Sequence, residues 1–114
     1  MREEYIVQSF LTKALQQARE SNASQIKSVQ IVIGEISELD QNTVRKLWEQ
    51  LSRGTLAERA QLRFRSVHAE VQCMACFEKY QPVDKKIHCP YCGSYGAKIL
   101  TGEEFHLETV ELEL

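Results

Sequence analysis

The sequence predicts an α+β fold: a three-stranded, mainly antiparallel sheet with two helices on one face, plus an inserted four-cysteine zinc ribbon. Three observations predict this fold. Two segments repeat apolar residues at helical spacing, and three segments alternate apolar with polar residues. Two Cys-x-x-Cys pairs lie between the last two alternating segments. The order helix, strand, helix, strand, insertion, strand is typical of the α+β class.

The first helix is expected over residues 4–20, where apolar residues recur every three or four positions. Glu3 and Glu4 lie at its start, where carboxylates complement the helix dipole. The first strand is expected over residues 28–36, because alternate positions there are apolar.

The second helix is expected over residues 41–52, with Asp40 as its N-cap and Thr43 as the alternative, because the side-chain oxygen of either residue can accept a backbone N–H from the first turn. The two remaining strands are expected over residues 61–70 and 104–112, which also alternate. The alternation of the last strand slips by one position near Glu108-Thr109, which predicts a β-bulge.

The four cysteines, Cys73, Cys76, Cys89 and Cys92, form two pairs of identical spacing separated by twelve residues. Two such pairs predict a zinc site with four thiolate ligands. Four thiolates complete a tetrahedral shell and leave no position for substrate, so we expect this zinc to be structural. The metal then replaces the hydrophobic core that residues 71–100 are too few to form.

Two alternatives for the cysteines remain: iron in a rubredoxin-like site, and, less consistent with two pairs, a redox Cys-x-x-Cys. The apolar candidates to pack around the site are Met74, Phe77, Tyr80, Tyr91 and Ile99. The linkers on either side of the ribbon also allow two protomers to exchange it, so a domain-swapped homodimer is a further alternative.

These predictions give two domains: residues 1–70 with 101–114 form the α+β domain, and residues 71–100 form the inserted ribbon. The net charge of −2 argues against nucleic acid as the main partner. No apolar run approaches the roughly 20 residues that a membrane span needs. No signal-peptide pattern follows Met1, so we expect a cytoplasmic protein. A closed zinc shell and the lack of a legible catalytic constellation argue against an enzyme.

Several segments, taken together, resemble one family. They are Met1-x-Glu3, Ile33-Gly34-Glu35-Ile36-Ser37, Arg53-Gly54-Thr55-Leu56-Ala57-Glu58, Cys73-x-x-Cys76, Cys89-Pro90-x-Cys92-Gly93-Ser94 and Thr101-Gly102-Glu103-Glu104-Phe105. In this order along the chain they resemble the HypA/HybF family of hydrogenase-maturation nickel metallochaperones. The resemblance implies a nickel-binding domain at the N-terminus and an inserted ribbon with structural zinc.

The resemblance also implies a function. Family members do not catalyse; they carry nickel and deliver it to a nickel enzyme, the large subunit of nickel–iron hydrogenase. The implied partners are a HypB-type GTPase, that large subunit and, in some bacteria, urease accessory proteins. The implied metals are structural zinc and transiently bound nickel.

Position 2 departs from the family pattern, because Arg2 stands where the family has histidine. The family holds nickel through the terminal amine, backbone amide nitrogens and that imidazole, with acidic groups assisting. The matching groups here are Met1, the backbone of Arg2, Glu3 and Asp40. A guanidinium stays protonated and has no lone pair for a metal.

Three interpretations of position 2 stay open. The nickel site is degraded and the protein acts as a zinc-ribbon scaffold for protein interaction. Alternatively, nickel binds more weakly through the remaining groups. In the third interpretation, the position was altered or the true start differs, and a native histidine is missing from this sequence.

Overall fold

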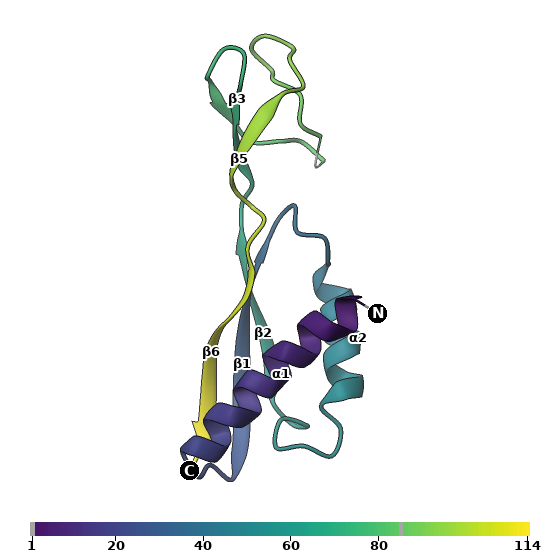
Figure 1. The fold of residues 1–114 in the computed structure, drawn as a ribbon, viewed down its shortest axis with the longest axis vertical. Helices are drawn as coiled ribbons and strands as arrows, with labels where there is room; N and C mark the ends of the chain where they lie inside the picture. The colour runs from purple at the N-terminus through teal and green to yellow at the C-terminus, as the bar shows by residue number, and fades with distance from the viewer. Residues whose placement is uncertain (1, 85) are drawn as a thin grey trace. The chain divides into compact units, whose positions relative to one another are not determined.

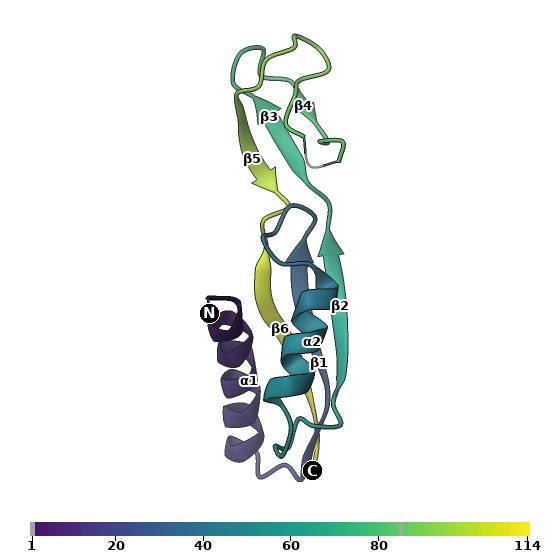
Figure 2. The same ribbon diagram turned by 90° about the vertical axis from the view of Figure 1, so that its right-hand side faces the viewer.

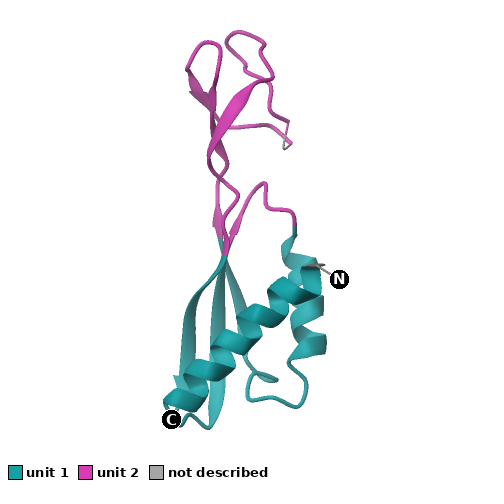
Figure 3. Ribbon diagram, in the orientation of Figure 1, with its two compact units in different colours: residues 1–32, 39–65, 106–114 teal, residues 33–38, 66–105 magenta. Residues whose placement is uncertain are grey.

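The computed structural model describes residues 2–84 and 86–114, and of Arg2 only the backbone. The chain divides into two compact units, which Figure 3 colours separately. Unit 1 comprises Met1–Val32, Leu39–Arg65 and His106–Leu114; unit 2 comprises Ile33–Glu38 and Ser66–Phe105. The assignment of the first domain to nickel and of the second to a zinc ribbon stays a prediction.

Unit 1 contains two helices, α1 (Arg2–Glu20) and α2 (Gln41–Leu51), shown in Figure 1. Asp40 is the N-cap of α2, as predicted: its Oδ1 accepts the N–H of Thr43 at 2.7 Å. The apolar side chains of both helices that are buried include Val7, Phe10, Leu11, Ala14, Ala18, Val44 and Trp48. Within the described residues, no helix combines the length and the apolar character that a membrane span requires.

The sheet of unit 1 has the strand order β2-β1-β6. These strands are β1 (Gln25–Gly34), β2 (Gln61–Val67) and β6 (Phe105–Glu113). The two helices lie on one face of this sheet, as Figure 2 shows from the side. The predicted fold class, two helices on a three-stranded sheet plus a four-cysteine module, is therefore confirmed.

The sheet is mixed, with one antiparallel and one parallel pair of strands. β6 runs antiparallel to β1: the N–H of Ser24 donates to the carbonyl of Glu113, and the N–H of Gly34 donates to that of Glu104. The arrows of β1 and β2 point the same way in Figures 1 and 2. The connection between these parallel neighbours contains α2, because parallel strands need a crossover rather than a hairpin.

The predicted slip in β6 coincides with a slip in its burial. Glu108 and Thr109 are both exposed, whereas Leu107 before them and Val110 after them are half-buried. Two successive exposed positions break the two-residue period of a strand. The β-bulge itself stays a prediction.

Unit 2 contains a second, antiparallel sheet of order β4-β3-β5. Its strands are β3 (Glu70–Cys73), β4 (Lys79–Tyr80) and β5 (Ala97–Thr101). The strand predicted over residues 61–70 is thus two strands, because β2 ends at Val67 and β3 begins at Glu70. The small core of this unit consists of Val71, Cys73, Tyr80 and Cys89.

Within unit 2, Gly34 and Gly102 approach each other so closely that neither has room for a side chain. A Cβ on Gly34 would overlap the carbonyl oxygen of Gly102, and a Cβ on Gly102 would lie 2.7 Å from the Cα of Ala69. Gly102 also has φ +114°, which disfavours other residues. We call Gly34, Gly102 and Ala69 the glycine contact. Glu35 secures it, because its carboxylate accepts the N–H of Ala69 at 2.8 Å.

Candidate metal centre

The Sγ atoms of Cys73, Cys76, Cys89 and Cys92 all lie within 4.8 Å of one another. The Sγ atoms of Cys73 and Cys92 are 3.5 Å apart, and those of Cys76 and Cys89 are 3.7 Å apart. All four thiols are free. A tetrahedral ion with metal–sulfur bonds of about 2.3 Å would place its ligands about 3.8 Å apart. The four sulfurs therefore fit one tetrahedral metal ion of the kind that thiolates bind.

Each Cys-x-x-Cys pair turns its backbone N–H groups toward the sulfur of its first cysteine. Cys73 Sγ accepts from the N–H groups of Ala75 and Cys76 at 3.3 and 3.4 Å, and Cys89 Sγ accepts from that of Tyr91 at 3.4 Å. Such donors stabilise a thiolate more than a thiol. The two turns therefore prepare their sulfurs for a cation before any metal binds.

The two turns also close in the same way. The N–H of Phe77 donates to the carbonyl of Cys73 at 3.0 Å, and the N–H of Gly93 donates to that of Cys89 at 2.9 Å. Both closing residues have positive φ, 65° for Phe77 and 82° for Gly93. The turns are therefore equivalent in structure, although one is closed by an aromatic residue and the other by glycine.

The four thiols differ in acidity because backbone N–H groups, desolvation and the neighbouring sulfurs act on each of them to a different extent. The N–H of Cys76, more than any other group, lowers the pKa of Cys73 to about 6. An N–H of Glu78 favours the Cys76 thiolate, but desolvation and the neighbouring sulfurs outweigh it and raise the pKa of Cys76 to about 12. A divalent cation would remove this repulsion between thiolates and so allow all four to ionise.

The side chains around the sulfurs follow the prediction only in part. Tyr80 belongs to the core beside Cys73 and Cys89, and Ile99 packs against it. Met74, Phe77 and Tyr91 are instead 58%, 67% and 66% exposed, so their predicted packing is wrong. They belong to the two turns, whose backbone faces the sulfurs and leaves these side chains to solvent.

Sequence reasoning missed the backbone groups that hold the two turns in place. The N–H of Met74 donates to the carbonyl of Gly96, and the N–H of Cys89 donates to that of Ser94, both at 2.9 Å. Main-chain groups are common to nearly all residues, so no sequence pattern marks these contacts.

The predicted nickel residues that the structure describes lie in unit 1. Met1 is outside the described residues, and the backbone of Arg2 begins α1. Glu3 is exposed in the first turn of α1, and Asp40 caps α2. Among the described residues, only the four cysteines form a group of three or more His, Cys, Asp or Glu side chains that could hold a metal. Glu3 and Asp40 are therefore not part of such a group.

The comparisons with known proteins all point to the same family. The family model described as hydrogenase/urease nickel incorporation, metallochaperone, HypA matches residues 1–112. A hydrogenase maturation factor HypA of Aquifex aeolicus is 32% identical over 114 residues, which cover 100% of this chain and 99% of that protein. Another from a Picosynechococcus species is 34% identical over 95 residues, covering 83% and 84%.

Solved structures show the same fold. The solution structure of the Ni metallochaperone HypA from Helicobacter pylori matches with a TM-score of 0.65 and 25% identity, covering 97% of each chain. A second solution structure of a HypA protein matches with a TM-score of 0.67 at 24% identity. The family match, the relatives and the four-cysteine cluster agree: this chain belongs to the HypA family of hydrogenase/urease nickel-incorporation metallochaperones.

Proposed function

We propose that this protein is a maturation factor that delivers nickel to a nickel enzyme, the large subunit of a nickel–iron hydrogenase. The match of the family model to residues 1–112 carries this proposal. We further propose that the four cysteines hold zinc and that the protein does not catalyse a reaction. In support, four sulfurs complete a tetrahedral shell and leave no open position on the metal.

The proposed nickel ligands are the amine of Met1, the backbone amides of Arg2 and Glu3, and the carboxylates of Glu3 and Asp40. The first N–H groups of a helix have no acceptor within that helix, so the amides that begin α1 are not committed to its hydrogen bonds. Asp40 is partly committed, because its Oδ1 accepts the N–H of Thr43. A carboxylate has two oxygens, so capping and ligation are compatible.

Arg2 weakens this proposed site in two ways. A guanidinium cannot donate a lone pair, and its positive charge repels a divalent cation. Imidazole is a nitrogen ligand well suited to nickel. We therefore expect Arg2→His to bind nickel at least tenfold more tightly than the wild-type protein, about 1.4 kcal/mol. Titration of the zinc-loaded protein with nickel against a competing chelator measures the difference.

The matched control is Arg19→His, which adds the same imidazole in the exposed last turn of α1. This variant should keep the wild-type nickel affinity. If Arg2→His also keeps it, position 2 does not govern nickel binding and the ligand set proposed here is wrong.

The proposed partners are a HypB-type GTPase, the hydrogenase large subunit and urease accessory proteins, met in the cytoplasm. Co-purification of the full chain with the GTPase from its own organism, with and without nickel, tests the first of them. A ribbon exchanged between two protomers also stays a prediction. Light scattering during gel filtration distinguishes such a dimer from a monomer.

A second candidate function is a protein-interaction scaffold whose nickel site is lost. Large exposed apolar side chains of unit 2 favour it, with Tyr95 at 76% and Phe77 at 67% exposed. A scaffold would bind the GTPase equally well without nickel, whereas a metallochaperone should respond to nickel.

A further inference from the structure

The four cysteines of unit 2 differ in their access to solvent. Cys73 and Cys89 are 0% and 1% exposed, and Cys76 is half-buried, whereas Cys92 is exposed. The cluster is therefore shielded on the side of the first three residues and open on the side of Cys92. Of the four, Cys92 is the one that a small solute reaches most easily.

The sulfur of Cys92 is also in a reactive form when the cluster holds a metal. A bound divalent cation keeps a coordinating thiol deprotonated, and the thiolate is the form that acts as a nucleophile. Susceptibility to oxidation follows thiolate character and exposure together. All four cysteines would share the thiolate character, but Cys92 alone among them combines it with exposure to solvent.

A second sulfur lies beside that of Cys92. Cys73 Sγ is 3.5 Å from Cys92 Sγ, less than the spacing of about 3.8 Å in a regular tetrahedron of thiolates around zinc. The N–H groups of Ala75 and Cys76 donate to Cys73 Sγ and stabilise it as a thiolate. Cys73 is therefore placed to attack an oxidised Cys92. This pair joins the two turns, whereas a redox motif of the thioredoxin type uses the two cysteines of one turn.

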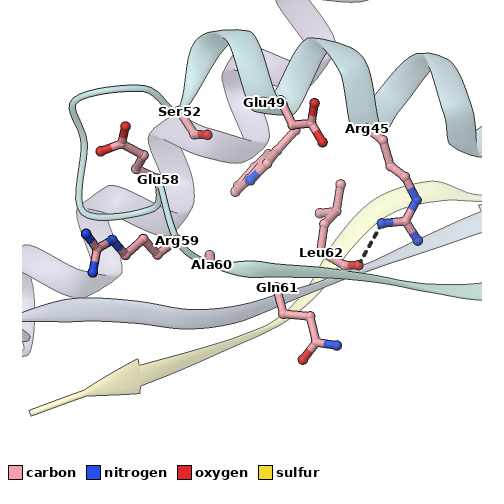
Figure 4. A pocket seen from close by; sticks show the side chains of 9 residues that line it. Arg45, Glu49, Ser52, Glu58, Arg59, Ala60, Gln61 and Leu62 are labelled. Atoms are coloured by element: carbon pink, nitrogen blue, oxygen red, sulfur yellow. Dashed lines mark hydrogen bonds between the residues drawn. The ribbon is translucent and has the colours of Figure 1, made fainter.

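The cavity that Figure 4 shows in unit 1 offers no comparable chemistry. It measures about 410 Å³ and lies between α2 and the segment that leads into β2, with Trp48 among its lining residues. Its charges balance, because Arg45 and Glu49 come from α2 while Glu58 and Arg59 come from the following segment. None of the described residues that line it carries a thiol, an amine or an imidazole. The open side of the cysteine cluster is therefore the stronger candidate for a further site.

We propose that Cys92 is a site of oxidation by peroxides and that Cys73 converts the oxidised sulfur into a disulfide, which releases the metal. In the first step, Cys92 Sγ attacks one oxygen of hydrogen peroxide. An S–O bond forms, the O–O bond breaks and hydroxide leaves, so that Cys92 becomes a sulfenic acid.

In the second step, the thiolate of Cys73 attacks the sulfur of Cys92. The S–S bond forms, the S–O bond breaks and a second hydroxide leaves. The two thiolates have then given two electrons to the peroxide, and both hydroxides take up protons from the buffer to become water.

The disulfide removes two of the four ligands from the cluster. Only Cys76 and Cys89 then remain, so a closed tetrahedral shell becomes an open site that holds its ion weakly. A dithiol reductant reverses the change, because it restores both thiolates. The proposal rests on the zinc proposed for these cysteines and adds to it a reversible sensitivity to oxidants.

The experiment uses the zinc-loaded full chain, freed of excess zinc, and a limiting amount of hydrogen peroxide. A coloured chelator measures the released zinc, and peptide mass spectrometry maps the modified cysteines. With dimedone present, which traps sulfenic acids, we expect the label on Cys92. Without dimedone we expect a Cys73–Cys92 disulfide and as much released zinc as disulfide. Dithiothreitol with added zinc should restore the loaded protein.

Cys92→His tests the same proposal by removing the sulfur. Three cysteines and one histidine are also a zinc donor set, so this variant can keep its ion. Peroxide should release zinc from it about fivefold more slowly than from the wild-type protein, or slower still. Met74→Leu is the matched control: it removes an exposed thioether of the first turn, which peroxide also oxidises, and should leave the release rate unchanged. The peptide map of the wild-type protein does not depend on whether Cys92→His folds.

Three results would overturn the proposal: dimedone on another cysteine ahead of Cys92, a first disulfide that does not join Cys73 to Cys92, or zinc that stays bound after this disulfide has formed. Elemental analysis before the peroxide is added keeps the proposed zinc separate. A chain without zinc would overturn both proposals, whereas any of the three results with a zinc-loaded chain would overturn the oxidation site alone.

Discussion

Phe77 occupies a backbone position that its counterpart in the second cysteine turn fills with glycine. Its φ of 65° lies in the left-handed region, where a bulky residue is strained, while Gly93 adopts 82° without a Cβ. The side chain of Phe77 gains little from packing, because it is 67% exposed. Packing of the Phe77 side chain therefore does not compensate for the strain in its backbone.

We expect Phe77→Gly to stabilise unit 2 by about 0.5–1 kcal/mol. Relief of left-handed strain is worth about 1–2 kcal/mol, and part of it is offset by the greater freedom of glycine in the unfolded chain. Denaturant unfolding of the zinc-loaded protein, followed by the backbone amides of unit 2, measures the change. Gly93→Ala is the reciprocal variant and should destabilise the unit. A loss of stability in Phe77→Gly would show that the aromatic contacts outweigh the strain.

Arg65 and Glu108 form an ion pair on the sheet of unit 1. Arg65 Nε donates to both carboxylate oxygens of Glu108, at 3.1 and 3.0 Å, and Gln30 donates to the same group at 2.8 Å. These hydrogen bonds, that of Arg65 first, hold the pKa of Glu108 below its ordinary value. The contribution of the pair to stability is therefore complete above the ordinary glutamate pKa and is lost as the pH falls through the lowered one.

Replacement of Arg65 should remove the part of the pH dependence of stability that comes from this ion pair. We expect Arg65→Gln to raise the pKa of Glu108, as measured by a carbon NMR titration of its carboxyl group. The variant should be less stable than the wild-type protein at neutral pH and equally stable once Glu108 is protonated. Arg63→Gln, two positions earlier in β2, is the control and should leave the Glu108 titration unchanged. An unaltered titration in Arg65→Gln would mean that Gln30 alone sets the pKa.

At the scale of elements, the cysteine turns and the strands between them have little core of their own. Among the described residues, the buried cluster of unit 2 has four members, and two of them are cysteines. Unit 1 has separate support from the apolar faces of α1 and α2. We therefore expect Cys73→Ser, or removal of the metal by a chelator, to unfold residues 71–100 while α1 and α2 persist.

Two measurements on the same sample follow the two units separately. Circular dichroism reports on the helices of unit 1, and the NMR spectrum of the backbone amides shows whether residues 71–100 are folded. Elemental analysis should find one tightly bound zinc per wild-type chain. Ser94→Ala is a suitable control, because it keeps the carbonyl that accepts from Cys89. Loss of the helical signal in Cys73→Ser would contradict the separate support proposed for unit 1.

The glycine contact leads to a further prediction about the stability of unit 2. Gly34→Ala should destabilise unit 2 by about 2–3 kcal/mol, because its Cβ would overlap the backbone of Gly102, which cannot move aside easily. Gly96→Ala is the matched control: the nearest atom to its Cβ, Ser94 Oγ, would be 3.8 Å away. Thermal unfolding of both variants, zinc-loaded, gives the comparison. Equal midpoints would show that the contact can relax.

The type and order of the elements in unit 1 could be predicted from sequence because each follows from a local pattern. The N-cap at Asp40 and the cysteine cluster are likewise set by residue types at short spacing. Strand ends were less accurate, and the division between β2 and β3 was missed. His68 and Ala69 continue the alternation of apolar and polar residues, but they lie between the two strands and belong to neither. The N–H of Ala69 donates to the side chain of Glu35 instead of to a neighbouring strand. A side-chain acceptor distant in sequence leaves no local pattern.

At the scale of the whole molecule, the composition of unit 2 was beyond sequence reasoning. Ile33–Glu38 belong to it although they follow directly on β1. What brings them there is the contact between Gly34 and Gly102, and a missing side chain gives no positive signal in a sequence. The cavity beside Trp48 was missed for a related reason, since it depends on where the segment after α2 lies. The family resemblance, in contrast, needed only short motifs in the order that the family has, and it is confirmed.

The glycine contact also has a consequence for biosynthesis. During translation, Gly34 leaves the ribosome long before Gly102, and all four cysteines emerge in the interval. The sulfurs can therefore capture their ion on a nascent chain while the two glycines are still apart. Metal capture can then come before the glycine contact forms. A cell short of this metal would release chains in which unit 2 lacks its central ion, although unit 1 has separate support.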